Sequence, residues 1–221
     1  MASQPPPDSP PAAPPPKAIN AKVARAKALL LTPDAEWRRI DAEPMTVREV
    51  MTGWAAPLAA IGPVAGLIGT QLFGFRALGL VYRPPLGTAL AGALIQYATA
   101  LVGVYVLALI IDAIAPSFGA ARDKVAATKA AVFSFTAAWL AGVFAAVPQL
   151  SVLGFVGLYS LYLLWVGLPI LMKPPADKAT NYAMVAIACG IVAYAVVGFI
   201  VGQVVGVFTP PPNSAGSVSL A

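Results

Sequence analysis

The chain has 221 residues, of which 59% are hydrophobic and 10% are charged, and its formal net charge is +5. This balance is far from that of soluble globular domains and indicates an integral membrane protein. Histidine is absent and Cys189 is the single cysteine, so His-dependent catalysis and an intramolecular disulfide are excluded, and a thiolate metal site lacks further ligands. We expect no enzyme activity, no cofactor, no metal site and no nucleic-acid partner.

The first 16 residues are dominated by proline, which occupies eight of the 16 positions. Proline has no backbone N–H to donate, so this composition predicts an extended, disordered tail over residues 1–16. No apolar h-region precedes the prolines, which argues against a secretory signal.

A basic amphipathic segment follows over residues 17–45. Its apolar side chains recur at spacings of four, three and four, which places them on one helical face: Ile19, Val23, Ala26 and Leu30. Its cations come without an acid between them: Lys17, Lys22, Arg25 and Lys27. Such a helix either lies in the headgroup plane, with these cations on anionic lipids, or docks on the protein's own cytoplasmic face.

Two further start signals precede the first apolar run. Thr32-Pro33-Asp34 predicts a short helix that begins with a threonine cap and ends before Pro44. Thr46 and Glu49 have the spacing of a capping box, which predicts the start of a longer helix at residue 47.

Four runs without charge follow, at 50–75, 84–111, 130–172 and 179–208. A membrane crossing needs about 20 apolar residues, so the 43-residue run must fold back, and Pro148-Gln149 is its most turn-like position. The prediction is an all-α, polytopic bundle of five transmembrane helices over 46–208, followed by a flexible tail over 209–221. The predicted helices cover 47–75, 86–111, 128–147, 152–172 and 180–208.

The lysines and arginines predict the orientation of this bundle. With five crossings, the N-terminal region and the second and fourth loops share one side and hold 12 of these residues, whereas Arg76 and Arg83 stand alone on the other side. The positive-inside rule therefore predicts a cytoplasmic N-terminus and an extracytoplasmic C-terminus.

Few polar groups fall near the spans. Asp112 ends the second predicted helix, so it is either a boundary residue in reach of water and of Arg122 or Lys124, or a buried ion or proton site. Gln96, within the same helix, is typical of a side chain that hydrogen-bonds between helices.

Small residues predict where helices pack closely. Gly62 and Gly66 lie four apart in the first predicted helix, with Pro63 between them, and the last helix carries a continuous stripe formed by Gly198, Gly202 and Gly206. Such stripes let a neighbouring backbone approach, whether it belongs to the same bundle or to another chain.

Five motifs follow one another along the chain: Leu31–Ile40, Pro57–Gly62, Val147–Gly154, Leu158–Gly167 and Lys173–Ala179. Their order resembles that of the Yip-domain family, specifically its bacterial members, over most of residues 25–208. The resemblance implies a five-span protein of the bacterial inner membrane. Eukaryotic members associate with prenylated Rab GTPases, but their Asp-Leu-Tyr-Gly-Pro motif has no counterpart here, so that role does not carry over.

Two functional classes follow from these features. The first is a non-catalytic scaffold or interaction protein that contacts the lipid bilayer and a membrane-protein partner or a second copy of itself. The second is a small channel or transporter, with Asp112 and the intramembrane glutamines on its path.

Overall fold

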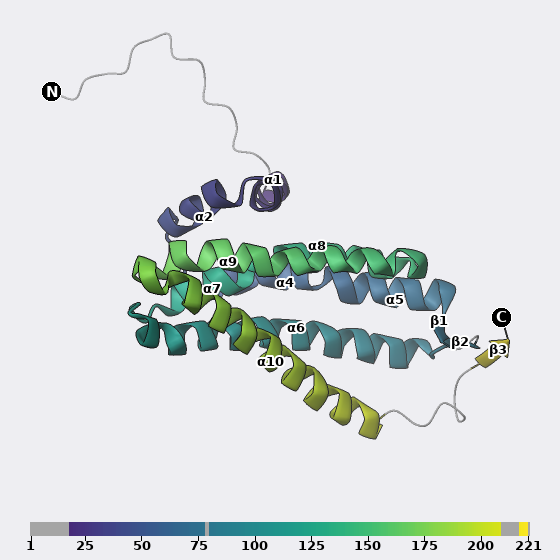
Figure 1. The fold of residues 1–221 in the computed structure, drawn as a ribbon. Coiled ribbons are helices and arrows are strands. Elements are labelled where there is room, and N and C mark those ends of the chain that lie inside the picture. Colours follow the sequence, from purple (N-terminus) through teal and green to yellow (C-terminus); the bar gives the residue numbers. More distant parts are fainter. Residues whose placement is uncertain (1–17, 78–79, 209–216, 221) are drawn as a thin grey trace, which may run out of the picture.

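The computed structural model describes residues 18–77, 80–208 and 217–220 and shows a bundle of long helices (Figure 1). Five helical stretches in these described residues are long and apolar enough to cross a membrane: Val47–Phe73, Leu86–Phe118, Lys124–Ala146, Val152–Met172 and Ala176–Gly202. The prediction of an all-α polytopic bundle with five spans is therefore confirmed. The predicted tail over 1–16 and Lys17 lie outside the described residues.

The first span is broken into four segments, not one kinked helix: α3 (Val47–Val50), the π-helix η1 (Met51–Ala55), α4 (Ala56–Ala59) and α5 (Ile61–Phe73). The Ala56 N–H bonds to Met51 O, which gives the wide turn of a π-helix just before Pro57. Pro63 has no N–H for Ala59 O, so the helix also breaks at Ala60. Gly74, with a φ of 73°, ends the span.

The two predicted caps have different outcomes. The capping box is confirmed, since the Thr46 N–H donates to Glu49 Oε2 at 2.7 Å and the Glu49 N–H donates to Thr46 Oγ1 at 3.2 Å. The threonine cap of the preceding helix is wrong. Thr32 Oγ1 donates to Ala28 O in the last turn of the preceding helix, so it does not cap α2 (Pro33–Ala42). Helix α2 begins with proline at its first position.

The second and third spans are longer than predicted on their facing ends. The second comprises α6 (Leu86–Ile114) and the 3₁₀ turn η2 (Ala115–Phe118), and the third comprises α7 (Lys124–Ser134), α8 (Thr136–Ala141) and the 3₁₀ segment η3 (Gly142–Ala146). The third span starts at Lys124 because the Asp123 carboxylate accepts from the N–H groups of Val125 and Ala126.

The long apolar run folds back at Val147, whose φ of −127° and ψ of 113° are extended, directly before Pro148. The fourth span then begins as the 3₁₀ segment η4 (Pro148–Leu158) and continues as α9 (Tyr159–Met172). Lys173 ends it in the left-handed conformation, and α10 (Ala176–Phe208) forms the fifth span.

Three short strands join the first loop to the end of the chain. The strands β1 (Phe75–Ala77), β2 (Leu80–Arg83) and β3 (Ser217–Leu220) pair antiparallel in that order. Residues 217–220, predicted as part of a flexible tail, therefore form a strand beside the first loop. Figure 1 shows this sheet at the end of the bundle opposite the α6–α7 and α9–α10 connections.

The N-terminal helices α1 (Ala18–Leu31) and α2 dock on the bundle (Figure 1), so of the two alternatives for this segment the structure favours docking on the protein's own surface. The Tyr159 hydroxyl donates to Leu30 O at 3.1 Å, and Lys173 pairs with Asp41 at 3.0 Å. These contacts join the last turn of α1 to the first residue of α9 and the last turn of α2 to the residue after α9, so α2 lies alongside α9.

Two buried contacts hold α2 in place. The fully buried Trp37 ring lies against Gly167 of α9, where an added Cβ would overlap the indole. Lys129 of α7 donates from Nζ to Ile40 O at 2.8 Å and to Glu43 O at 2.6 Å, at the C-terminal end of α2. A cation at that end offsets the partial negative charge of the helix carbonyls.

The two ends of the bundle differ in packing. Buried hydrophobic side chains gather where α2, α7 and α9 meet the last turns of α6 and the first turns of α10. Large exposed hydrophobic side chains lie along α5, the first half of α6, η4 and much of α10. An apolar surface of this extent is typical of contact with lipid.

Candidate functional site

Asp112 is more enclosed than its place near the end of a span predicts. Its side chain is 5% exposed, and its Oδ1 has no hydrogen-bond partner among the described residues. Helix α6 continues for two residues beyond it and η2 follows, which separates Asp112 from Arg122 in the exposed loop and from Lys124 at the start of α7. Asp112 is therefore not a boundary residue in open contact with water, as the first of the two sequence interpretations had it.

Gln96 lies elsewhere on α6. Its side chain is exposed, and its separation of 16 positions from Asp112 corresponds to about 24 Å along the helix axis. The structure thus does not bring the two candidate polar residues into one site.

The candidate glycines differ in what they face. A Cβ at Gly62 would lie 3.7 Å from the Cα of Gly142, so the first span and η3 approach closely there. A Cβ at Gly66, Gly198 or Gly202 would meet no atom within 4 Å in the described part of the chain. In the described part of the chain, no helix of the bundle therefore packs closely against Gly198 or Gly202. The surroundings of Gly206 lie outside the described residues.

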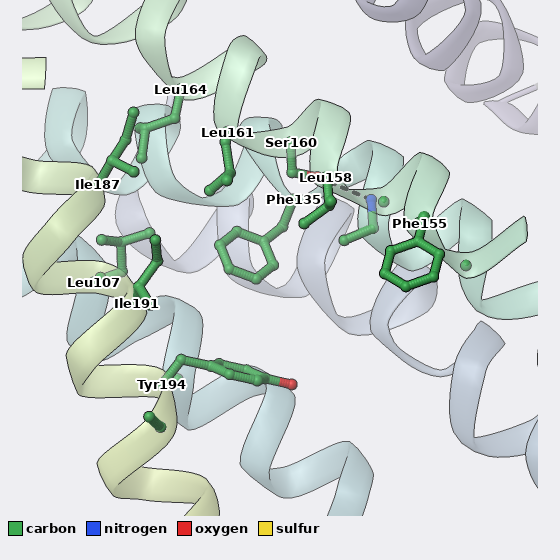
Figure 2. A pocket seen from close by; sticks show the side chains of 16 residues that line it. Leu107, Phe135, Phe155, Leu158, Ser160, Leu161, Leu164, Ile187, Ile191 and Tyr194 are labelled. Carbon is green, nitrogen blue, oxygen red and sulfur yellow. Dashed lines mark hydrogen bonds between the residues drawn. The ribbon is translucent and has the colours of Figure 1, made fainter. Parts of the chain in front are cut away.

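A cavity of about 650 Å³ lies between α10, η4, the start of α9 and α6, and we name it the α9–α10 cavity (Figure 2). Leu107 and Gly103 line it from α6, and Phe155 and Leu161 line it from η4 and α9. Its wall on α10 is a single helical face made by Ile187, Gly190, Ile191, Tyr194 and Ala195.

The lining of this cavity is mainly apolar. Ser160 is one of its few polar residues, and the Ser160 hydroxyl already accepts a hydrogen bond from the Ala138 N–H at 2.9 Å. The side chain of Tyr194 also reaches its edge, as Figure 2 shows. Such a lining suits hydrocarbon or the apolar face of a helix, and it offers no set of groups for acid–base or nucleophilic chemistry.

The glycine stripe continues the α10 wall of this cavity. Gly198 and Gly202 lie seven and eleven residues after Ile191, which are helical repeats of two and three turns. Both glycines are exposed. A segment that lies in the cavity and continues along α10 would therefore pass from the side chains of Ile191 and Tyr194 to positions 198 and 202, which carry none.

The sequence contained the residues of this cavity but no signal for it. Glycine and alanine spacing indicated a close-packing face on the last helix, whereas the cavity depends on α10 diverging from the bundle, as Figure 1 shows. That divergence depends on contacts between α10 and helices distant in sequence, which no local sequence pattern predicts.

The family model of the Yip1 domain matches residues 27–209 of the chain. No curated protein and no solved structure matches the chain.

Proposed function

Because the chain belongs to the Yip1 domain family, we propose that it is a non-catalytic membrane scaffold that holds another transmembrane segment in its α9–α10 cavity. The observation that carries the proposal is the open face of α10, where Gly198 and Gly202 have no described atom within 4 Å of an added Cβ. Lipid and leucine are about equally apolar, so helices associate in a bilayer through close backbone packing on faces of this kind.

Gly202→Leu tests this proposal. The variant is expected to insert normally, since leucine favours the bilayer, but to lose the complex with its partner helix because four added carbons fill the contact surface. Size-exclusion chromatography with light scattering, on protein purified from native membrane in mild detergent, measures that loss.

The matched control is Ala193→Leu, nine residues earlier and half a helical turn away from the stripe. It is expected to retain the complex. If Gly202→Leu and the parent chain elute with the same mass, whether as monomers or as complexes, the stripe faces lipid and the scaffold proposal fails.

We further propose that the membrane is the bacterial inner membrane, with a cytoplasmic N-terminus and an extracytoplasmic C-terminus. The 12 lysines and arginines on one side against two on the other support this orientation. The pairing of residues 217–220 with the first loop also supports it. One span separates that loop from the N-terminus, so the loop and the end of the chain beside it lie on the opposite side of the membrane from the N-terminus.

A reporter fused after Ala221 tests the orientation. Alkaline phosphatase at this position is expected to be active, since it folds only outside the cytoplasm, and a green fluorescent reporter at the same position is expected to stay dark. The same pair of reporters fused within the loop between α6 and α7 should give the opposite signals. A fluorescent C-terminal fusion would contradict the proposed orientation.

A further inference from the structure

A second cavity lies on the N-terminal side of the bundle, and we name it the N-terminal cavity. It has a volume of about 590 Å³ and is enclosed by α1, α2, the turn after α2, α3, η1 and one side chain of α7. Small residues make the space, because Ala21, Ala24 and Ala28 face it from α1 and Gly53 faces it from η1. A Cβ at Gly53 would meet no atom within 4 Å.

The charges around this cavity balance. Its lining includes three cations and three carboxylates: Lys22, Arg25, Arg39, Glu36, Glu43 and Glu49. An occupant with a net charge would therefore gain on one side and be repelled on the other, whereas an occupant with both signs of charge matches the lining.

Arg25 is already engaged within the protein. Its guanidinium donates from Nε to Glu36 Oε1 at 3.1 Å and from Nη2 to Glu43, and it lies 5.9 Å from the centre of the Phe133 ring. It is therefore turned toward the protein and held by the two carboxylates. Lys22 and Arg39 are exposed at the rim.

The floor of the cavity is apolar. Val50, Trp54 and Phe133 form it, and Trp54 is held in place because its Nε1 donates to Thr136 Oγ1 at 3.0 Å. Glu49 is the last charged residue before the charge-free run that begins at Val50. The cavity thus spans the change from charged segment to membrane span, where an amphiphile places its headgroup.

The π-helix supplies one wall of this cavity. A π-helix inserts an extra residue in a helical turn and is frequent at functional sites. Here two consecutive residues of the π-helix line the cavity. Gly53 leaves space because it has no side chain, and the Trp54 ring forms part of the floor.

We propose that the N-terminal cavity binds the zwitterionic headgroup of a phosphatidylethanolamine lipid. Lys22 and Arg39 meet the phosphate. Glu43 and Glu49 already accept hydrogen bonds on Oε2, from Arg25 and Thr46, and their other carboxylate oxygens meet the primary ammonium, which donates hydrogen bonds to carboxylates. The glycerol and acyl chains leave along the apolar floor toward the bilayer. This site lies apart from the α9–α10 cavity and does not depend on the proposed scaffold function.

Native mass spectrometry of the full chain tests this site, with equal amounts of phosphatidylethanolamine, phosphatidylcholine and phosphatidylglycerol that share the same acyl chains. Choline has no N–H to donate and the glycerol headgroup carries no cation, so each loses one half of the recognition. We expect about tenfold stronger retention of phosphatidylethanolamine, as the loss of a charge-assisted hydrogen bond implies.

Two variants and one control locate the binding. Gly53→Leu fills the cavity, and Arg39→Gln removes an exposed cation without burying a new group; both are expected to abolish the preference. Gly92→Leu, at an exposed glycine of α6 where a Cβ also meets no atom within 4 Å, is expected to keep it.

Three results would overturn the proposal. They are equal retention of the three lipids, a preference for phosphatidylglycerol, or a preference that survives both Gly53→Leu and Arg39→Gln. Soluble glycerophosphoethanolamine at the same concentration distinguishes the source of the headgroup, since displacement of the lipid by it would mean that a free metabolite, not a membrane lipid, is the ligand.

Discussion

Gly167→Leu is expected to release α2 from the bundle. The Trp37 indole occupies the space that a Cβ at position 167 would need, and both partners are packed on all sides, so the leucine and the indole exclude each other. Loss of a buried tryptophan contact is expected to lower the free energy of unfolding by about 3–5 kcal/mol. Thermal unfolding of the detergent-solubilised protein measures the change.

Limited trypsin digestion separates release of α2 from general unfolding. In the variant, cleavage within residues 18–42 should become fast while the bundle stays intact. Gly154→Leu is the control, because this glycine of the same span is exposed and a Cβ there meets no atom within 4 Å. Equal digestion of the two variants would show that the Trp37 contact does not hold α2.

Lys129→Met is expected to destabilise the same docking from the other side. Methionine has a similar length but no donor, so Ile40 O and Glu43 O lose a charged hydrogen-bond partner in a buried position. Two such bonds, offset in part by the relief of burying an ammonium group, lead us to expect a loss of about 2–4 kcal/mol in the free energy of unfolding. Thermal unfolding in detergent again gives the readout.

Lys124→Met is the matched control on the same helix, at an exposed position. It is expected to leave the midpoint of unfolding within a degree or so, as surface substitutions do. A Lys129→Met midpoint equal to that of the control would mean that water replaces the ammonium group without loss.

The spans were predictable because their signal is local. Charge-free runs longer than a bilayer needs, separated by lysines and prolines, leave few alternatives, and Pro148 marked the fold-back within two residues of Val147. The capping box of Thr46 and Glu49 was equally local, since both of its hydrogen bonds join residues three apart.

The docking of α1 and α2 was not predictable in the same way. Trp37 meets a glycine in another span, and Lys129, near the start of the third predicted helix, is buried because its ammonium group donates to the carbonyls of Ile40 and Glu43. Arg25 likewise turns inward because Glu36 and Glu43 come from a different helix. Each depends on a partner distant in sequence, whose position no periodicity encodes.

The candidate site shows the same limit. The stripe formed by Gly198 and Gly202 was identified from its spacing, but whether a neighbouring helix covers it depends on the path of α10 after Gly190. Asp112 was identified as the one charge at a span end, and its enclosure follows from the packing of α6 against α7 and α10, not from its position in the run.

The contact between Trp37 and Gly167 also orders events during synthesis. The two residues are 130 positions apart, so at about 5–20 residues per second the glycine follows the tryptophan out of the ribosome after about 7–26 seconds. Lys129, the other residue that holds α2, comes 38 residues before the glycine, so it too is synthesised well after α2. Until Gly167 is made, the Trp37 indole lacks the surface of α9 that it packs against, so the docking of α1 and α2 is completed only after the fourth span has been synthesised.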